Sequence, residues 1–437
     1  MAGLIGLPLA HYWLVAQVEP FYSSIYCFLW WAYIFALDFV VFKLRGNSLL
    51  HDRPKEFLFL SIWSVPTWLI FEMANLRLHN WYYVMAPRGW WGMFFLVLAF
   101  GTVLPGLFET TELILGLLEK FSHSGKISGR PFTVTPLNIL LQFTLGIVML
   151  LLMLALPQAF FCLAWGFAYF LTDPICYWVW RKGKNHVGRS LLGQLVAGDN
   201  TRLIALLAAG FVCGGLWESW NLGARTKWIY SVPFFDELKL GEMPILGFFG
   251  FPPFALECYA IINFLSLTRG GRNWELSASE NATRPGMPKW AVALTGIVLP
   301  LAILCAGLAI IQKTIASYSD HLDWYFDSEL GPQGVAALKS RNALQGNQFL
   351  KLNQRPAEID PALFDRLKRL SAISELKGIG LRNALALEDL GIKTAHDLAQ
   401  QDPTALFLKL KESRQRLRLE EVKVWVRAAR KQQKIGQ

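Results

Sequence analysis

Within the apolar segments of this 437-residue sequence, six acidic residues form two sets of three that occur in the same order. An ionised side chain at the centre of a bilayer raises the insertion free energy by roughly 2.5–3.5 kcal/mol. Such acids are therefore expected to face a bundle interior, to be protonated or to be hydrogen-bonded. A buried carboxylic acid can donate a proton, and a nearby carboxylate can remove one. The acids are Asp38, Glu72 and Glu109, followed by Asp173, Glu218 and Glu257.

Glu109 and Glu257 lie nearest the middle of their predicted spans, where hydration at the membrane surface does not explain an acid. They are the first pair of candidate catalytic residues. Glu72 and Glu218, near the outer ends of two other spans, are the second pair. The alternative for the second pair is an ordinary wet residue at the interface.

Polar and aromatic residues near these acids are candidates for lipid or substrate binding. An Asn one helical turn beyond each outer Glu shares its helix face, and a Trp-x-Tyr sequence follows each. The inner Asp residues complete the set, although they could instead bind Lys or Arg in the loops, and the aromatic residues could simply anchor helices at the interface. The set is Asn75, Asn221, Trp81, Tyr83, Trp228, Tyr230, Asp38 and Asp173.

The composition predicts the apolar helices that must position these side chains. Hydrophobic residues make up 54% of the chain and charged residues 17%, against about 25% charged in soluble proteins. An ordinary soluble protein and a disordered chain are therefore excluded. The net charge of +10 is expected of basic membrane loops and does not indicate nucleic acid. Since no Cys or His residues have metal-ligand spacing, we predict no metal site.

Eight segments are long and apolar enough to cross a bilayer, which takes roughly 20 residues. Basic residues gather in the loops after the first, third, fifth and seventh spans, so both termini are predicted to lie outside, on the periplasmic face of a bacterial inner membrane. The spans are about 22–43, 57–75, 91–117, 137–157, 159–180, 201–221, 244–267 and 290–313. The loop residues include Arg45, Arg53, Arg181, Lys182, Lys184, Arg189, Arg269 and Arg284.

The two halves of the membrane part resemble each other. Besides the acids, Arg-Gly-Asn-Ser-Leu-Leu (45–50) matches Val-Gly-Arg-Ser-Leu-Leu (187–192). Four spans per copy give both copies the same orientation, as in parallel repeats. The predicted fold is an all-α polytopic bundle of two parallel four-helix repeats with a small soluble helical C-terminal domain. The predicted domains are 1–157, 158–313, a linker or collar at 314–360, and 361–437.

The spacing of Glu72, Trp81 and Tyr83, followed by a helix with Gly101, Pro105 and Glu109, resembles that of integral-membrane lycopene cyclases. Glu218, Trp228 and Tyr230 lead into a similar helix with Glu257. The resemblance implies a cofactor-independent carotenoid or terpenoid cyclase. In such an enzyme an acid protonates a double bond, aromatic faces stabilise the cation and a second carboxylate removes a proton.

The C-terminal part resembles helix-hairpin-helix domains through Leu-Lys-Gly-Ile-Gly (376–380) and the sequence 390–399. Pro361 suits a helix start, Gly391 a helix end and Thr394 an N-cap. In that family the hairpin presents backbone N–H groups to a phosphate, which implies a binding role for Gly378, Ile379, Gly380 and Arg382. An outside location favours a protein partner of 361–437 over nucleic acid, and the basic tail around Trp425 could also lie on lipid.

Two other functions stay open. The first is a non-catalytic subunit or scaffold of a membrane complex, which would bind lipid, quinone or pigment in its bundle and dock partners through its C-terminal domain. The second is a proton-coupled transporter, because duplicated bundles with midplane acids are also found there.

Overall fold

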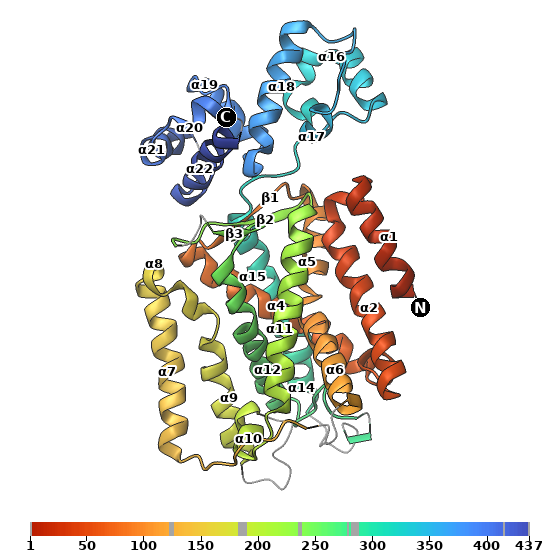
Figure 1. Ribbon diagram of the computed structural model, residues 1–437, viewed down its shortest axis with the longest axis vertical. Helices are drawn as coiled ribbons and strands as arrows, with labels where there is room; N and C mark the ends of the chain where they lie inside the picture. Colours follow the sequence, from red (N-terminus) through yellow and green to blue (C-terminus); the bar gives the residue numbers. More distant parts are fainter. Residues whose placement is uncertain are drawn as a thin grey trace. The chain divides into compact units, whose positions relative to one another are not determined.

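The computed structural model is almost entirely helical (Figure 1). It describes residues 2–121, 126–181, 190–234, 238–277, 279–280, 288–413 and 416–435. Lys182, Lys184, Arg189 and Arg284, which contributed to the predicted orientation, lie outside the described residues. The chain divides into two compact units. Unit 1 is Met1–Leu78, Met93–Ala224 and Pro233–Ile311; unit 2 is His79–Gly92, Arg225–Val232 and Gln312–Gln437.

The prediction of an all-α polytopic membrane bundle is confirmed. By length and composition, seven helices of the described residues can cross a membrane, or eight if one pair bent by 43° counts as a span. That pair is Pro157–Ala164 with Phe167–Trp180. The helices are α2 (Ile25–Arg45), α3 (Leu49–Asp52), α4 (Pro54–Leu78), α5 (Gly89–Phe100), α6 (Val103–Phe121), α7 (Pro136–Ala155), α8 (Pro157–Phe160), α9 (Phe167–Trp180), α10 (Leu191–Val196), α11 (Thr201–Gly223), α12 (Phe251–Leu267), α14 (Lys289–Ala293) and α15 (Leu299–Thr314).

Residues 2–16, for which no element was predicted, form an apolar helix, α1 (Ala2–Ala16). Its 15 residues fall short of the roughly 20 that a span needs. Gly3 brings α1 into backbone contact with α2, because an added Cβ there would lie 2.6 Å from the carbonyl carbon of Phe35. A short strand pair, β3 (Lys239–Leu240) with β4 (Met243–Pro244), also belongs to unit 1.

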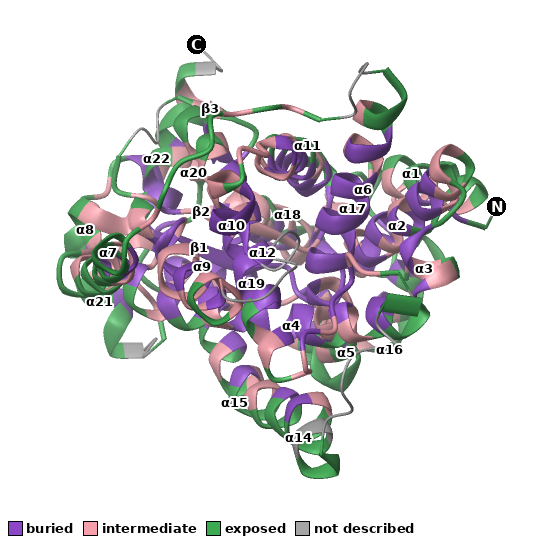
Figure 2. Cartoon of the chain, turned by 90° about the horizontal axis from the view of Figure 1, so that it is seen from below, coloured by how far each residue is buried: buried purple, intermediate pink, exposed green. Residues whose placement is uncertain are grey.

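The helices of unit 1 differ in how much apolar surface they leave uncovered. α12 is mostly buried, whereas α7 is mostly exposed (Figure 2). An apolar surface of this kind would be unfavourable in water, but lipid tails cover it at no such cost. The exposed side chains of α7 include Leu137, Leu140, Leu141 and Leu151.

Small residues let α11 approach α12 closely. An added Cβ at Gly210 would lie 2.6 Å from the carbonyl oxygen of Phe251 and 2.8 Å from the Cα of Pro252. Both atoms belong to the backbone, so neither can move aside without moving the helix. Gly214, four residues on, packs against the Phe251 ring. This spacing is the small-residue pattern of close helix pairs in membranes.

We therefore expect Gly210→Leu to destabilise unit 1 by about 1–3 kcal/mol or more, the usual range for overpacking. The measurement is the thermal aggregation midpoint of the full-length protein in detergent. Gly215→Leu is the matched control, since nothing lies within 4 Å of an added Cβ at that position. Equal midpoints for the two variants would contradict the close packing of α11 on α12.

Unit 2 combines short helices with one two-stranded antiparallel sheet. Strand β1 pairs with β2, so Trp81 lies opposite Tyr230 and Tyr83 opposite Trp228. The two Trp-x-Tyr sequences thus pair with each other. The elements are β1 (Trp81–Val84), β2 (Lys227–Tyr230), α16 (Leu322–Ser340), α17 (Gly346–Phe349), α18 (Pro361–Glu375), α19 (Leu381–Asp389), α20 (Ala395–Ala399), α21 (Pro403–Ser413) and α22 (Leu419–Ile435).

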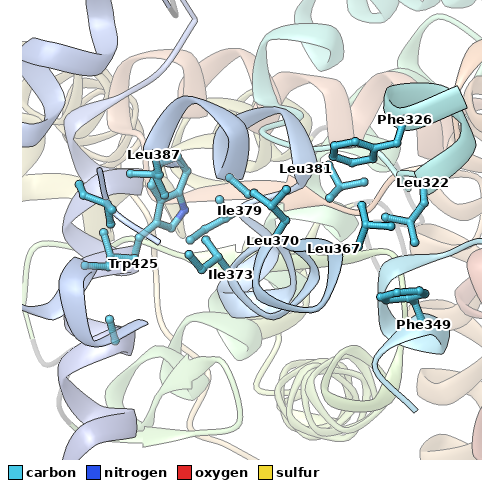
Figure 3. Close-up of a cluster of buried hydrophobic side chains, with 14 of the residues drawn as sticks. Leu322, Phe326, Phe349, Leu367, Leu370, Ile373, Ile379, Leu381, Leu387 and Trp425 are labelled. Atoms are coloured by element: carbon cyan, nitrogen blue, oxygen red, sulfur yellow. The ribbon is translucent and has the colours of Figure 1, made fainter. Parts of the chain in front are cut away.

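One hydrophobic core runs through the helices of unit 2 (Figure 3). Phe326 of α16, Phe349 of α17, Ile379 and Trp425 of α22 all belong to it. The segment 314–360, expected to be a linker or collar, therefore supplies helices to the same core. The predicted local signals hold, because Asp360 caps α18 ahead of Pro361 and Thr394 caps α20 in a capping box with Asp397.

Candidate functional site

The six repeated acids lie in unit 1 and all are buried, with exposed fractions of at most 7%. They come from α2, α4, α6, α9, α11 and α12. Burial of a carboxyl group is unfavourable unless hydrogen bonds or a counter-charge compensate it. The partners of each acid therefore separate those with a structural role from those free for chemistry.

The inner Asp residues bind the backbone of the loop that follows each of them. Asp38 Oδ1 accepts a hydrogen bond from Leu50 N at 2.8 Å, and the Asp173 carboxylate accepts from Leu191 N and Leu192 N at 2.8 Å each. These N–H groups belong to the first turns of the short helices α3 and α10. The duplicated Asp residues thus hold equivalent turns, and backbone N–H groups take the place of the Lys or Arg side chains that were the alternative partners.

Glu257 has a comparable structural partner. The chain between α8 and α9 breaks after a short 3₁₀ helix (Phe161–Ala164), and α9 begins at Phe167. Glu257 Oε1 accepts a hydrogen bond from Ala168 N at 2.8 Å, in the first turn of α9. A carboxylate is favourable there because the first N–H groups of a helix lack intrahelical partners.

Glu109, the matched acid of the first half, has no such backbone donor. Helix α2 runs unbroken from Ile25 to Arg45, so no helix start lies opposite Glu109. Its carboxyl group lies beside the Asp38 carboxyl and near the Arg53 guanidinium. The Glu109 side chain hydrogen-bonds to that of Asp38, and among the described residues no other donor reaches either of its oxygens. Two adjacent carboxyl groups can hydrogen-bond to each other only when one of them carries a proton.

Aromatic rings lie within one helical turn of this acid pair. Gly106, one turn before Glu109, packs on the Trp30 ring, from which an added Cβ would be 2.8 Å away. Tyr33 Oη and Thr110 Oγ1 are 2.9 Å apart. Trp30 also contacts Trp220, with ring centroids 5.0 Å apart. Aromatic faces of this kind attract a positive charge.

A series of charged residues next to Glu109 was not predicted. Glu112 pairs with Arg45 and, at 3.5 Å, with Arg53, and Arg45 also pairs with Glu119 at 2.9 Å. From the sequence, Arg45 and Arg53 are loop charges that set the orientation, and the structure places both in ion pairs with Glu112. The i, i+3 spacing of Glu109 and Glu112 on one helix face was the available signal.

The loop after α12 folds back into unit 1 and contributes buried residues. Trp274 is 1% exposed, and its ring stacks on Phe108 with centroids 4.5 Å apart. Its carbonyl oxygen accepts from Arg53 Nη1 at 2.5 Å. Glu275 pairs with Arg202 at 2.7 Å, and burial raises the pKa of Glu275 despite that pairing. Burial likewise lowers the pKa of Arg53, although nearby Glu109 opposes the shift.

The outer Glu and Asn residues and the Trp-x-Tyr sequences that follow them belong to different units. Glu72 accepts from Trp68 Nε1 at 3.0 Å, and Asn75, Asn221 and Glu218 are buried with it in unit 1. The four aromatic residues instead lie in unit 2, where Trp228 Nε1 donates to Tyr230 Oη at 2.9 Å. The sheet therefore brings the aromatic residues of both halves together, and the acids remain in the helices.

The predicted phosphate-binding hairpin packs inside unit 2. Gly380 N donates to Ser374 O at 2.8 Å, and Leu381 N donates to Asp320 Oδ2 at 3.0 Å. Gly378 lies against the Val84 side chain, and Ile379 is fully buried. Arg382 is exposed. Several N–H groups of the hairpin thus already have acceptors within the protein.

Comparison of the chain with protein families, with curated proteins and with solved structures finds no match in any of the three.

Proposed function

We propose that this integral membrane protein is an acid catalyst for an isoprenoid-type lipid, a cofactor-independent cyclase or isomerase in which Glu109 donates the proton. The observation that supports this is the Glu109 carboxyl, which is fully buried and hydrogen-bonds to the Asp38 carboxyl, so that one of the two acids must carry a proton. The other mid-membrane acid, Glu257, has a backbone partner that gives it a structural role.

The proposed reaction is an isomerisation, in which the product has the same atoms as the substrate. Glu109 adds a proton to a carbon–carbon double bond, and the electron pair of that bond forms the new C–H bond and leaves a carbocation. The Trp30 and Tyr33 rings stabilise the cation. A proton then leaves a neighbouring carbon for Oδ2 of Asp38, because Oδ1 binds Leu50 N. The electrons of the broken C–H bond form a new double bond, and proton transfer between the paired acids restores the starting state.

The test is incorporation of deuterium. Membranes of an isoprenoid-producing host that expresses the full-length protein are incubated in deuterated water, and lipid extracts are analysed by mass spectrometry. We expect isoprenoids heavier by one mass unit. Glu109→Gln should reduce their rate of formation by about 100-fold or more, the lower range for general acid catalysis.

Glu257→Gln is the matched control, because an amide oxygen can still accept the Ala168 N–H. It should retain most of the labelling. Absence of protein-dependent label, or equal label in the parent and in Glu109→Gln, would refute the proposal.

Proton-coupled transport is the second candidate, and the charged series beside Glu109 favours it. Side-chain exposure falls from 51% at Glu119 to 20% at Arg45 and 4% at Glu112. The charged series therefore extends inward from the surface of unit 1. Proton uptake by proteoliposomes that depends on Glu109, without labelled lipid, would favour transport over catalysis.

A further inference from the structure

Arg88 links the start of α16 to the start of a membrane span. Gly89, the next residue, begins the candidate span Gly89–Phe121, which comprises α5 and α6. Arg88 Nη2 donates to Asp320 Oδ1 and to Tyr325 Oη at 2.6 Å each, and all three residues belong to unit 2. Since Asp320 directly precedes α16 and Tyr325 lies in its first turn, the start of this helix is held beside the start of the span.

Backbone hydrogen bonds fix the same arrangement. Ser319 N donates to Ala86 O at 2.8 Å, and Ala86 N donates to Ser317 O at 3.2 Å. The segment that leads into α16 therefore runs along the segment that leads into the span. The position of α16 beside the start of the span thus does not depend on the Arg88 side chain alone.

The length of the span places its first turn at the level of the lipid headgroups. Its 33 residues extend about 50 Å at 1.5 Å per residue, whereas a bilayer with its headgroups is about 40–45 Å thick. Trp90 and Trp91 in the first turn are 75% and 47% exposed, and Trp is enriched at the membrane–water interface. Residues held beside this turn therefore lie near the headgroups as well.

The surface that α16 presents there consists of an aromatic ring and a cation. Trp324 is 50% exposed, with the Arg88 guanidinium carbon 4.7 Å from its ring centroid and the His321 ring stacked on it at 4.4 Å. The Arg88 side chain is 42% exposed. Among the described residues, Arg88 Nη1 has no acceptor. Arg88 is thus fixed through Nη2, and its other terminal nitrogen is available to a ligand.

The phosphate of a phospholipid matches this surface. Arg forms strong charge-assisted hydrogen bonds to phosphate oxygens, and a Trp ring is favourable where an apolar and a hydrated layer meet. Lipid is favoured over a protein partner because the surface is continuous with the exposed first turn of a membrane span. Asp320 already balances the charge of Arg88, so a zwitterionic headgroup fits without any need for an anionic lipid.

We infer that Arg88 and Trp324 form a docking surface for phospholipid headgroups, in which Arg88 Nη1 donates to the phosphate and the Trp324 ring lies among the headgroups. The segment 314–360, expected to be a linker or collar, then holds unit 2 on the bilayer surface. This role is independent of the chemistry at Glu109, so the inference and the proposed function can fail separately.

The first test measures the depth of Trp324. The full-length protein carries fluorinated tryptophan in nanodiscs of phosphatidylcholine, and fluorine NMR is recorded with a nitroxide either on the headgroup or deep in the acyl chain. The Trp324 signal, assigned by its loss in Trp324→Phe, should be broadened strongly by the headgroup nitroxide and weakly by the chain nitroxide. Trp425, fully buried in the core of unit 2, is the control and should be broadened less by the headgroup nitroxide.

The second test examines the phosphate contact. Native mass spectrometry of the full-length protein in detergent measures binding of phosphatidylcholine and of diacylglycerol with the same chains. A hydrogen bond to a charged group changes affinity by about 10-fold or more, so Arg88→Met should weaken binding of one phosphatidylcholine by that factor and leave diacylglycerol unchanged. Asp320 keeps donors from Tyr325 and Leu381, so the variant is expected to fold. Arg382→Met, at an exposed position of α19, should bind like the parent.

Either test can overturn the inference. A Trp324 signal broadened as little as that of Trp425 would place α16 away from the bilayer and leave its surface to a protein partner. Equal phosphatidylcholine binding by the parent and by Arg88→Met, or the same loss in Arg382→Met, would refute the phosphate contact.

Discussion

Replacement of Arg225 by Met is expected to destabilise unit 2 by about 3 kcal/mol, the lower end of the range for breaking a buried ion pair. Arg225 is 5% exposed at its side chain, and its two terminal nitrogens bind Glu375 at 2.5 and 3.0 Å. The variant leaves the Glu375 carboxylate without its counter-charge. The lower end applies because Glu375 remains 22% exposed to solvent at its side chain.

The effect is local, and the measurement must be local too. Hydrogen exchange of the full-length protein in detergent should show protection of the α18 and β2 amides reduced by about 100-fold, the factor that 3 kcal/mol corresponds to. The double variant Arg225→Met with Glu375→Leu should recover much of the lost amide protection, because an apolar pair can replace a buried ion pair.

A second ion pair of unit 2 is the control. Arg366 binds Glu388 at 2.9 Å but is 34% exposed at its side chain, and pairs exposed in this way contribute about 0–1 kcal/mol. Arg366→Met should therefore change protection little. If Arg225→Met also left α18 unchanged, the link between the segment 225–232 and α18 would be of no energetic importance.

The membrane helices could be predicted from the sequence because each is specified by its own run of apolar residues. The eight predicted spans correspond to the seven spanning helices and the bent pair. α1 was missed since its length is below the threshold. The two-repeat organisation stays a prediction, which the equivalent turns held by Asp38 and Asp173 support.

The candidate site could be predicted only in part. Glu109 was predicted from its position near the middle of a span. That Glu257 has a backbone donor and Glu109 has none was not predicted, because this donor exists only where the chain breaks before α9. Gly166 stands at the start of α9, where the first half has Trp31, and this was the available signal. Arg53 and Trp274 were not predicted, since loop residues become buried only through contacts between segments more than 200 residues apart.

Trp425→Ala is expected to destabilise unit 2 by about 3–5 kcal/mol, the range for removing a large buried aromatic side chain. The sequence left open whether α22 lies on lipid or on a partner through this residue. In the structure Trp425 is fully buried and shares a core with Ile373 and Leu387 (Figure 3). Its neighbour Val424 packs in a second cluster with Val84 and Ile229 of the sheet.

Hydrogen exchange of α19 and α22 in the full-length protein measures this effect. Trp425→Phe keeps most of the apolar volume and should lose less protection than Trp425→Ala. Lys423→Ala, at an exposed position of the same helix, should leave protection unchanged. A helix that used Trp425 to lie on lipid would lose membrane contact in Trp425→Ala while α19 kept its protection. Loss of protection in both helices would instead show that α22 stabilises the core that holds the hairpin 376–380.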